Sequence, residues 1–135
     1  MGILTLTFEQ VDMLHASSID EFGGLKGSFN DTQERVESCL AQIDVVFGYE
    51  RYKTIEEKAG ALLYFLAKNH CYVDGNKRVA FACCDVFLLI NGKELTLSED
   101  DATTLVNNVA SSNVSGQAID EYIKVIANTI KENCI

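Results

Sequence analysis

The segment from about Asn76 to Ile90 limits the possible folds more than any other part of the chain. Its apolar residues lie on every side of a helix instead of on one face, and Asn91-Gly92 is a typical helix end. Such a helix needs other elements around it, because its apolar surface must be removed from water. We therefore expect it to be the central helix. Its apolar residues include Ala80, Phe81, Val86, Phe87, Leu88 and Ile90.

Helical spacing and N-terminal caps predict five further helices around this segment. Each cap is a Ser, Thr or Asp followed three residues later by Glu, Gln or Asp, which satisfies free amides of a first helical turn. The second helix is expected to extend to Phe47, before Gly48, and the third to about Asn69. The cap pairs are Thr7 with Gln10, Asp31 with Glu34, Thr54 with Glu57 and Ser98 with Asp101, and the sixth helix begins near Gln117.

The fold class expected from these segments is all-α. Strand patterns at residues 3–6 and 94–97 are too short to build a sheet without partners. A chain of 135 residues has enough length for one domain with a substantial core, and too little for two ordinary ones. We predict a compact bundle of about six helices that occupies residues 1–135 as a single domain, with a central buried helix.

Charge and hydropathy exclude several classes of function. The 20 acidic and 11 basic residues produce a net charge of −9, which repels a nucleic-acid backbone over most of the surface. No run reaches ~18 apolar residues and the N-terminus lacks a secretory pattern, so we expect a cytoplasmic protein without membrane contact. The five cysteines form no CxxC pair and are expected to be reduced and mainly structural.

One polar segment, residues 70–78 (HCYVDGNKR), separates two nearly all-apolar helices. Gly75 permits a turn, and the amides that follow it then lie in the first turn of a helix, where they lack intrahelical partners. Such a helix start binds anions. Lys77 and Arg78 add positive charge that the helix dipole disfavours unless an anion is bound. We expect a phosphate group at this position.

Asp74 and His70 complete the chemistry of this segment. Beside a polyphosphate, the Asp74 carboxylate is suited to bind Mg²⁺, and His70 is suited to act as a base. Each residue alone also has a structural explanation, since a His can cap a helix end and Asp-Gly-Asn is a common turn. Their combination at this spacing favours transfer of a phosphoryl or nucleotidyl group to a hydroxyl.

This segment resembles the signature of the Fic/Doc superfamily, His-Pro-Phe-x-(Asp/Glu)-Gly-Asn-x-Arg, in which a loop joins two core helices. The ending Gly-Asn-Lys-Arg is similar to the Doc branch, and weaker similarity extends from about Thr5 to Leu97. The resemblance implies that His70 deprotonates the target hydroxyl and that Asp74 binds Mg²⁺. The implied catalytic residues are His70, Asp74, Asn76, Lys77 and Arg78, and the implied nucleotide-binding residues are Gly75, Asn76, Lys77 and Arg78.

Lys77 and Phe81 bear on the reaction that the resemblance implies. Fic proteins that transfer AMP have a small Gly where this chain has Lys77, and usually a second Arg where it has Phe81. The resemblance to Doc implies transfer of the γ-phosphate of ATP to a Ser or Thr hydroxyl of a protein, with elongation factor Tu as the implied target. Two alternatives stay open: AMP transfer by the same loop, and a catalytically silent module that binds nucleotide or a partner.

Regulation is expected to come from another protein. Fic proteins inhibit themselves with a helix that carries (Ser/Thr)-x-x-x-Glu-(Gly/Asn), and this chain contains no such motif. The resemblance to Doc therefore implies a small antitoxin that acts in trans.

Two segments depart from the family pattern near the expected site. Cys71-Tyr72 replaces Pro-Phe; Tyr72 is the expected aromatic anchor, and Cys71 is assigned no role. Residues 23–31 resemble a Gly-Gly-x-x-Gly-x-Arg-Asp element that lacks its Arg. Residues 47–53 are expected to form the flap that aligns the target, although Tyr49 and Tyr52 also suit closure of the core.

Two further titratable residues have less specific interpretations. Asp85 lies about two helical turns after Arg78, on the same face, where it either orients nearby cations or belongs to a polar stripe. His15 is expected to be an ordinary core or surface histidine.

Overall fold

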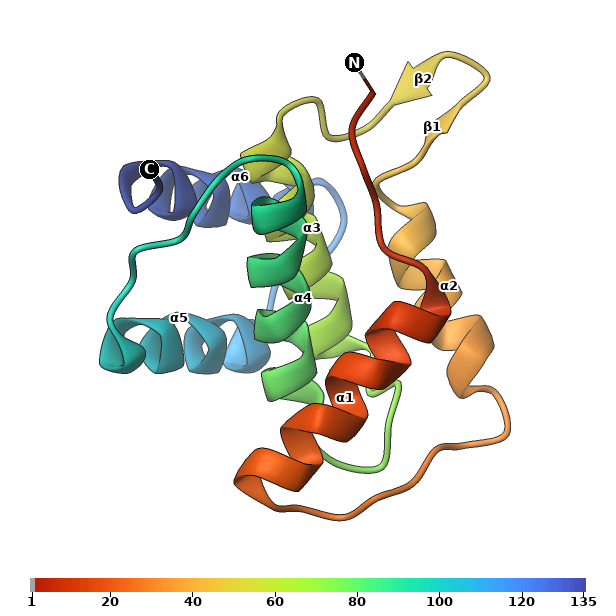
Figure 1. The fold of residues 1–135 in the computed structure, drawn as a ribbon. Helices are drawn as coiled ribbons and strands as arrows, with labels where there is room; N and C mark the ends of the chain where they lie inside the picture. The colour runs from red at the N-terminus through yellow and green to blue at the C-terminus, as the bar shows by residue number, and fades with distance from the viewer. Residues whose placement is uncertain (1) are drawn as a thin grey trace.

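The computed structural model describes residues 2–135 and contains six α-helices in that range (Figure 1). The fold is all-α, as predicted. Its only strands in the described range form a small antiparallel hairpin, in which Val45 pairs with Glu50 and Val46 with Tyr49. The elements are α1 (Phe8–Phe22), α2 (Thr32–Ala41), β1 (Val45–Val46), β2 (Tyr49–Glu50), α3 (Ile55–Lys68), α4 (Asn76–Ile90), α5 (Glu99–Ser111) and α6 (Gln117–Glu132).

The centre of the fold is shared by two helices. As predicted, α4 is central, and it packs against α1, α3 and α5 (Figure 1). The preceding helix α3 is more completely enclosed, because it contacts α2, α4, α5 and α6. Near its end α4 reaches the surface, where Leu89 is 52% exposed. The buried residues of α4 are Val79, Ala80, Cys83, Cys84, Phe87 and Leu88.

Three of the four predicted caps form as expected. The hydroxyls of Thr7, Thr54 and Ser98 each accept a hydrogen bond from the amide three residues later. The prediction for Asp31 was wrong in its detail: it precedes α2, but its side chain forms no cap. That carboxylate instead accepts a hydrogen bond from Arg35 Nε at 3.0 Å, since an acid and a base four residues apart on a helix are neighbours.

The second helix is shorter than predicted. It ends at Ala41, and the chain then forms the β1–β2 hairpin, whose turn contains Phe47 and Gly48 at positive φ. Phe47 projects fully into solvent instead of extending the apolar face of α2. A tight two-residue turn with both residues at positive φ suits the twist of a hairpin, and this local geometry replaces the helix.

The two predicted strand patterns build no sheet, as expected. Leu95 makes an isolated bridge to Cys134 near the end of the chain. Leu4, near the start, exchanges hydrogen bonds through its backbone with the side chain of Asn91.

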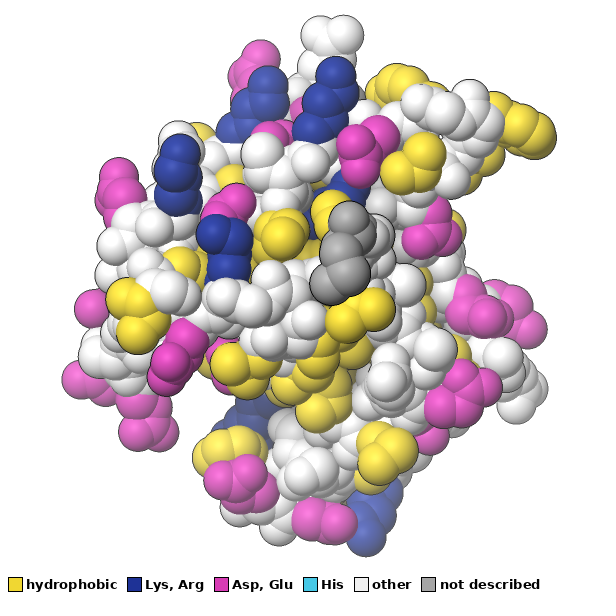
Figure 2. All heavy atoms as spheres, turned by 45° about the horizontal axis from the view of Figure 1, so that its top comes forward, with side chains coloured by type: hydrophobic (Ala, Val, Ile, Leu, Met, Phe, Trp, Pro, Cys, Tyr) yellow, Lys and Arg dark blue, Asp and Glu magenta, His cyan; other side chains and the backbone are white. Residues whose placement is uncertain are grey.

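The surface agrees with the acidic composition. Figure 2 shows acidic side chains spread over one face among fewer Lys and Arg side chains, as the net charge of −9 requires. No helix in the described range is both long and apolar enough to span a membrane.

The arrangement of α3 and α4 positions the polar segment. α3 ends at Lys68 and α4 begins at Asn76. Residues 69–75, here called the connection, therefore lie at one end of this central pair of helices, beside α1 (Figure 1). The β1–β2 hairpin precedes the opposite end of α3. A helix of 14 residues spans about 21 Å, which separates the hairpin from the polar segment.

Candidate active site

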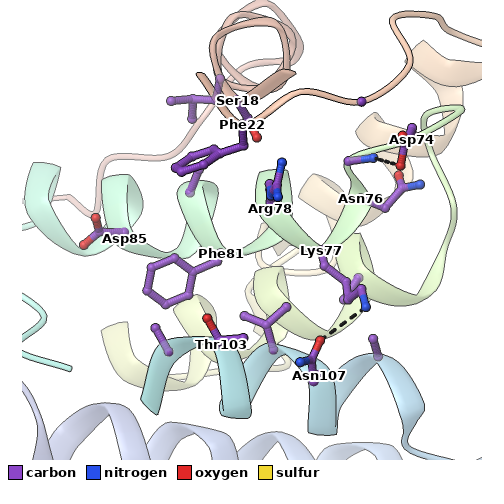
Figure 3. A pocket seen from close by; sticks show the side chains of 18 of the residues that line it. Ser18, Phe22, Asp74, Asn76, Lys77, Arg78, Phe81, Asp85, Thr103 and Asn107 are labelled. Carbon is purple, nitrogen blue, oxygen red and sulfur yellow. Dashed lines mark hydrogen bonds between the residues drawn. The ribbon is translucent and has the colours of Figure 1, made fainter. Parts of the chain in front are cut away.

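An open cleft of about 1250 Å³ brings the predicted site residues together (Figure 3). Its walls are α1, α4, α5 and the connection between α3 and α4. All six residues predicted to act in catalysis or nucleotide binding line it: His70, Asp74, Gly75, Asn76, Lys77 and Arg78.

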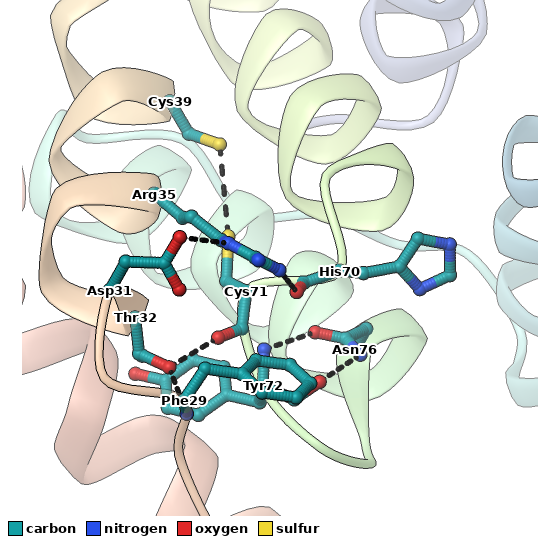
Figure 4. Close-up of polar contacts among 9 residues, drawn as sticks. All are labelled: Phe29, Asp31, Thr32, Arg35, Cys39, His70, Cys71, Tyr72 and Asn76. Carbon is teal, nitrogen blue, oxygen red and sulfur yellow. Dashed lines mark hydrogen bonds and ion pairs between the residues drawn. The ribbon is translucent and has the colours of Figure 1, made fainter.

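His70 lies at the start of the connection, in a left-handed conformation with φ of 46°. Arg35 of α2 donates a hydrogen bond from Nη1 to the His70 carbonyl at 2.8 Å (Figure 4). The imidazole points away from these α2 contacts, is exposed, and lines the cleft. The backbone is therefore held while the ring stays accessible to a ligand. Arg35 was missed by the sequence analysis, because it lies 35 residues away and belongs to no motif.

Asn76 holds the connection in shape through its side chain. Its Oδ1 accepts a hydrogen bond from the Tyr72 amide at 3.0 Å, and its Nδ2 donates one to the Tyr72 carbonyl at 2.9 Å (Figure 4). Each polar group of the side chain thus makes one bond within the loop. The second Nδ2–H and the backbone amide of Asn76 make no hydrogen bond within residues 2–135.

Tyr72 anchors the connection in the core, as predicted, with 1% of its surface exposed. Its hydroxyl donates a hydrogen bond to Asp12 at 3.0 Å, and burial together with this carboxylate raises the pKa of the phenol. The ring stacks on His15 of α1, with centroids 3.7 Å apart.

His15 is a buried core histidine, as predicted, but it also contacts the site. Its Nε2 lies 2.7 Å from the carbonyl oxygen of Asp74, a distance that requires Nε2–H to donate. Together with the Tyr72 stack, this bond fixes the connection against α1. Nothing in the sequence around His15 indicates that this side chain would contact Asp74 and Tyr72.

The Asp74 carboxylate is held by two backbone amides. Leu25 donates to Oδ2 at 3.0 Å and Gly75 donates to Oδ1 at 2.8 Å. The Leu25 bond, followed by the Gly75 bond, lowers the pKa of Asp74 below its ordinary value. The group is fully exposed, so each oxygen keeps room for a further partner. An oriented, ionised and accessible carboxylate fits the oxygen ligands that Mg²⁺ requires.

Residues 23–31, and not residues 47–53, lie along the connection. The Val73 amide donates to the Gly27 carbonyl at 3.3 Å, and Ser28 forms an antiparallel bridge with Tyr72. The expectation that residues 47–53 form a flap at the site was therefore wrong, because the chain places them at the other end of α3. Tyr52 closes the core there, with its hydroxyl bonded to Asp120 at 2.7 Å.

Gly24 is predicted to be required for the contact between residues 23–31 and Asp74. A Cβ at Gly24 would lie 2.9 Å from Asp74 Oδ2, and φ there is 120°. We expect Gly24→Ala to displace the carboxylate, break its bond with the Leu25 amide and raise the pKa of Asp74 toward its ordinary value. A carboxyl titration followed by NMR measures this change.

Gly23→Ala is the matched control for that experiment. Gly23 also has a positive φ, of 83°, but a Cβ there meets nothing within 4 Å. Both variants should lose about 1–2 kcal/mol of stability from backbone strain. Only Gly24→Ala should change the Asp74 titration, and an equal change in both variants would contradict the steric explanation.

The start of α4 presents positive charge to the cleft. The amides of Asn76, Lys77 and Arg78 have no hydrogen-bond partner within residues 2–135. Lys77 Nζ contacts Asn107 Oδ1 of α5 at 3.2 Å (Figure 3). Arg78 contacts the Gly23 carbonyl at 3.4 Å, and its guanidinium lies 4.7 Å from the centre of the Phe22 ring. Neither cation forms an ion pair with a described acidic residue. The site is therefore suited to an anion.

The remainder of the cleft comes from α1, α4 and α5. Phe22, Thr103 and Asn107 line it and were missed, because nothing in their local sequence indicates a site (Figure 3). Asp85 also lines it, and partial burial, followed by the nearby Glu94, raises the pKa of its carboxyl. Asp85 makes no ion pair with a described cation, so the structure favours the polar-stripe interpretation over an orienting role.

Comparison with known proteins places this geometry in a family. The family model described as the Fic/DOC family matches residues 5–88, which include α1 to α3, the connection and most of α4. The chain belongs to the Fic/Doc family. It is 38% identical over 114 residues to "Toxin Doc" of Mycolicibacterium smegmatis, an alignment that covers 80% of this chain and 83% of that protein.

The name of a second relative states an activity. The chain is 26% identical over 116 residues to "Protein kinase doc" of Escherichia phage P1, covering 86% of this chain and 90% of that protein. The predicted resemblance to the Doc branch of the Fic/Doc family is thereby confirmed.

Proposed function

We propose that this Fic/Doc protein is a Doc-like toxin that transfers the γ-phosphate of ATP to a Ser or Thr hydroxyl of a protein. One observation carries the proposal: the accessible His70 imidazole and the start of α4 line the same cleft. At that helix start the first amides have no hydrogen-bond partner in the described chain, and Lys77 and Arg78 have no acidic partner there. The name of the phage P1 relative supports a kinase, and the name of the Mycolicibacterium smegmatis relative supports a toxin of the Doc type. We assign the activity to residues 1–135 as one domain.

His70 is proposed as the base. Its backbone is fixed by Arg35 while its ring faces the cleft, so the ring can receive the proton of the target hydroxyl. The hydroxyl oxygen forms a bond to the γ-phosphorus as the bond to the bridging oxygen breaks, and ADP leaves.

The phosphate groups of ATP are proposed to lie at the start of α4. Gly75 permits the turn that starts this helix, and the amides of Asn76, Lys77 and Arg78, which have no partner within residues 2–135, would bind the phosphate. Lys77 and Arg78 would neutralise charge that spreads over the phosphoryl oxygens in the transition state. Asp74 would hold Mg²⁺, which when bound neutralises phosphate charge. The Leu25 and Gly75 amides keep the Asp74 carboxylate ionised and oriented for this role.

Lys77 supports phosphoryl transfer over AMP transfer. Its side chain extends from α4 to Asn107 of α5 and so fills space at the phosphate end of the cleft. A nucleotide that placed its α-phosphate there would have to displace this side chain. Phe81, on the following turn, adds an apolar wall instead of a second cation.

The partners are proposed from the resemblance to the family and from the relatives. A toxin of the Doc type needs a protein target, for which elongation factor Tu is the proposed candidate, and an antitoxin that acts in trans. Both would be met in the cytoplasm.

A paired labelling assay tests the proposed reaction. Purified protein is mixed with a cell lysate, Mg²⁺ and ATP labelled on either the α- or the γ-phosphate. We expect one His70-dependent protein band with the γ-label and none with the α-label. A His70-dependent band with only the α-label would replace the kinase by an AMP transferase, and nucleotide binding without any band would favour a silent binding module.

Replacing Lys77 with Gly is predicted to change the labelled phosphate. Removal of the side chain opens the space between α4 and Asn107, so some label should transfer from α-labelled ATP. Lys77→Met is the matched control, because it removes the charge and keeps most of the bulk, and it should produce no α-label transfer. Unchanged γ-transfer in Lys77→Gly would show that this side chain does not set the orientation of the nucleotide.

A further inference from the structure

Two buried cysteines meet directly beside the candidate base. Cys39 of α2 and Cys71 of the connection are both 0% exposed, and their sulfur atoms lie 4.0 Å apart (Figure 4). No other pair of cysteines in residues 2–135 makes such a contact. Cys71 follows His70 directly in the chain, so this sulfur pair connects α2 to the segment that carries the candidate base.

The two sulfurs differ in their surroundings. The hydrogen bond from Cys39, and then the nearby Arg35 guanidinium, lowers the pKa of Cys71 despite its burial. The same contact and burial raise the pKa of Cys39. The lower pKa makes Cys71 the more acidic of the two thiols, and the thiolate is the form that reacts with an oxidant. Cys83 and Cys84 lack this activation, because burial raises the pKa of both.

A path to solvent lies one residue away from the pair. The exposed residue Asn69 donates a hydrogen bond from Nδ2 to Cys39 Sγ at 3.1 Å, and the half-buried Arg35 lies against the connection on the same side. Both cysteines are 0% exposed, so a molecule as small as a peroxide reaches the sulfurs only if these two polar side chains move.

The position of Cys71 connects its sulfur to the backbone that holds His70. α2 already holds the connection through its backbone, because Arg35 bonds the His70 carbonyl and Thr32 Oγ1 donates to the Cys71 carbonyl at 2.6 Å (Figure 4). A disulfide has a sulfur separation of about 2.05 Å. Closing the gap from 4.0 Å draws the two sulfurs together, and any shift of Cys71 in this movement would also displace His70, its neighbour in the chain.

We propose that Cys39 and Cys71 form a reversible disulfide with a peroxide as oxidant, and that this bond inactivates the candidate site by displacing His70. The Cys71 thiolate attacks the peroxide, forms a sulfenic acid and releases hydroxide. The Cys39 sulfur then attacks the sulfenic sulfur, which forms the disulfide and releases water. In total two thiols and one hydrogen peroxide produce one disulfide and two waters, and a dithiol reductant restores both thiols. The effect on activity rests on the proposed function, whereas formation of the bond does not.

Peptide mapping tests the bond without any assay of activity. Cleavage after Lys and Arg places Cys39 in residues 36–51, Cys71 in 69–77, Cys83 and Cys84 in 79–93, and Cys134 in 132–135. After treatment of the folded protein with equimolar hydrogen peroxide, we expect 36–51 joined to 69–77, and release of the two peptides by dithiothreitol. A link that involves 79–93, or no link at all, would overturn the proposal.

The labelling assay, repeated with Cys39→Ala, tests the inactivation. Peroxide should reduce transfer by the unmodified protein about 100-fold, since a displacement of about 1 Å at a catalytic group has effects of this size. Cys39→Ala should keep its activity after peroxide, and Cys39→Ser is a second variant in case the smaller side chain lowers stability. The matched control Cys83→Ala, which removes a neighbouring buried thiol, should remain sensitive.

The two proposals fail in different ways. A mapped disulfide in a protein that never transfers phosphate would refute the proposed function and leave the bond intact. Equal peroxide sensitivity of Cys39→Ala and the unmodified protein would refute the switch, because another residue would then be the site of damage.

Discussion

Replacing His70 with Asn is expected to reduce phosphoryl transfer about 10²- to 10⁴-fold, the usual contribution of a general base. Asn is the informative replacement because φ at this position is 46°, a left-handed conformation that Asn tolerates better than Ala. The side chain is exposed in the cleft and is not part of the core, so the replacement should change packing little. Transfer of the γ-label to the protein target measures the loss.

Binding and folding should be retained in this variant. ATP affinity, measured by calorimetry, should stay within about 3-fold of the unmodified protein, because a base acts in the transition state and not in ground-state binding. Melting temperature should change little. Retention of full transfer would remove the assignment of His70, and loss of ATP binding would indicate that it positions the nucleotide instead.

Replacing Asp74 with Asn is expected to raise the Mg²⁺ concentration needed for half-maximal transfer about 10- to 100-fold, the effect known for disturbed metal sites. Asn has the same shape and still offers one oxygen to the Leu25 or Gly75 amide, so the connection should keep its form. The missing negative charge is then the main change. A titration of activity against Mg²⁺ at saturating ATP measures the effect.

Asp85→Asn is the matched control, because Asp85 is a second carboxylate of the same cleft and lies on α4. It should leave the Mg²⁺ dependence unchanged. An equal shift in both variants would mean that the effect comes from the net charge of the cleft and not from a ligand at Asp74.

The lowered pKa of Asp74 also predicts how pH acts on this site. Its folded-state pKa lies below the ordinary value of 3.8, so the hydrogen-bonded carboxylate favours folding above that pH. This contribution is lost as the pH falls through the folded-state pKa. A decline of transfer between pH 5 and 8 therefore cannot be assigned to Asp74. Replacement of Asp74 should leave such a decline in place, and replacement of the residue that titrates there should remove it.

Local signals made most of the helices predictable. Thr7, Thr54 and Ser98 cap their helices with the amide three residues on, an interaction that depends on nothing outside one turn. The prediction failed at Asp31, where Arg35 competes for the carboxylate, and at Phe47, where a hairpin turn replaces the end of α2. In both cases the same sequence pattern allows a second local structure: an ion pair in place of a cap at Asp31, and a hairpin turn in place of a helix end at Phe47.

The site was predictable only where its residues are contiguous. His70, Asp74 and the start of α4 form one segment, so their meeting in a cleft follows from a single connection between two core helices. The supporting residues are remote: His15 reaches the Asp74 carbonyl across 59 positions, and Arg35 reaches the His70 carbonyl across 35. No spacing rule predicts such pairs.

The sequence by itself determined the six helices, the family and the candidate base, metal ligand and anion site, because caps, apolar periodicity and a contiguous motif are local properties. Only the tertiary structure decided that residues 23–31 and not 47–53 lie along the site, and that Cys39 meets Cys71. The physical reason is that these contacts depend on how helices pack. Packing direction depends on the whole buried surface and cannot be read from any one segment.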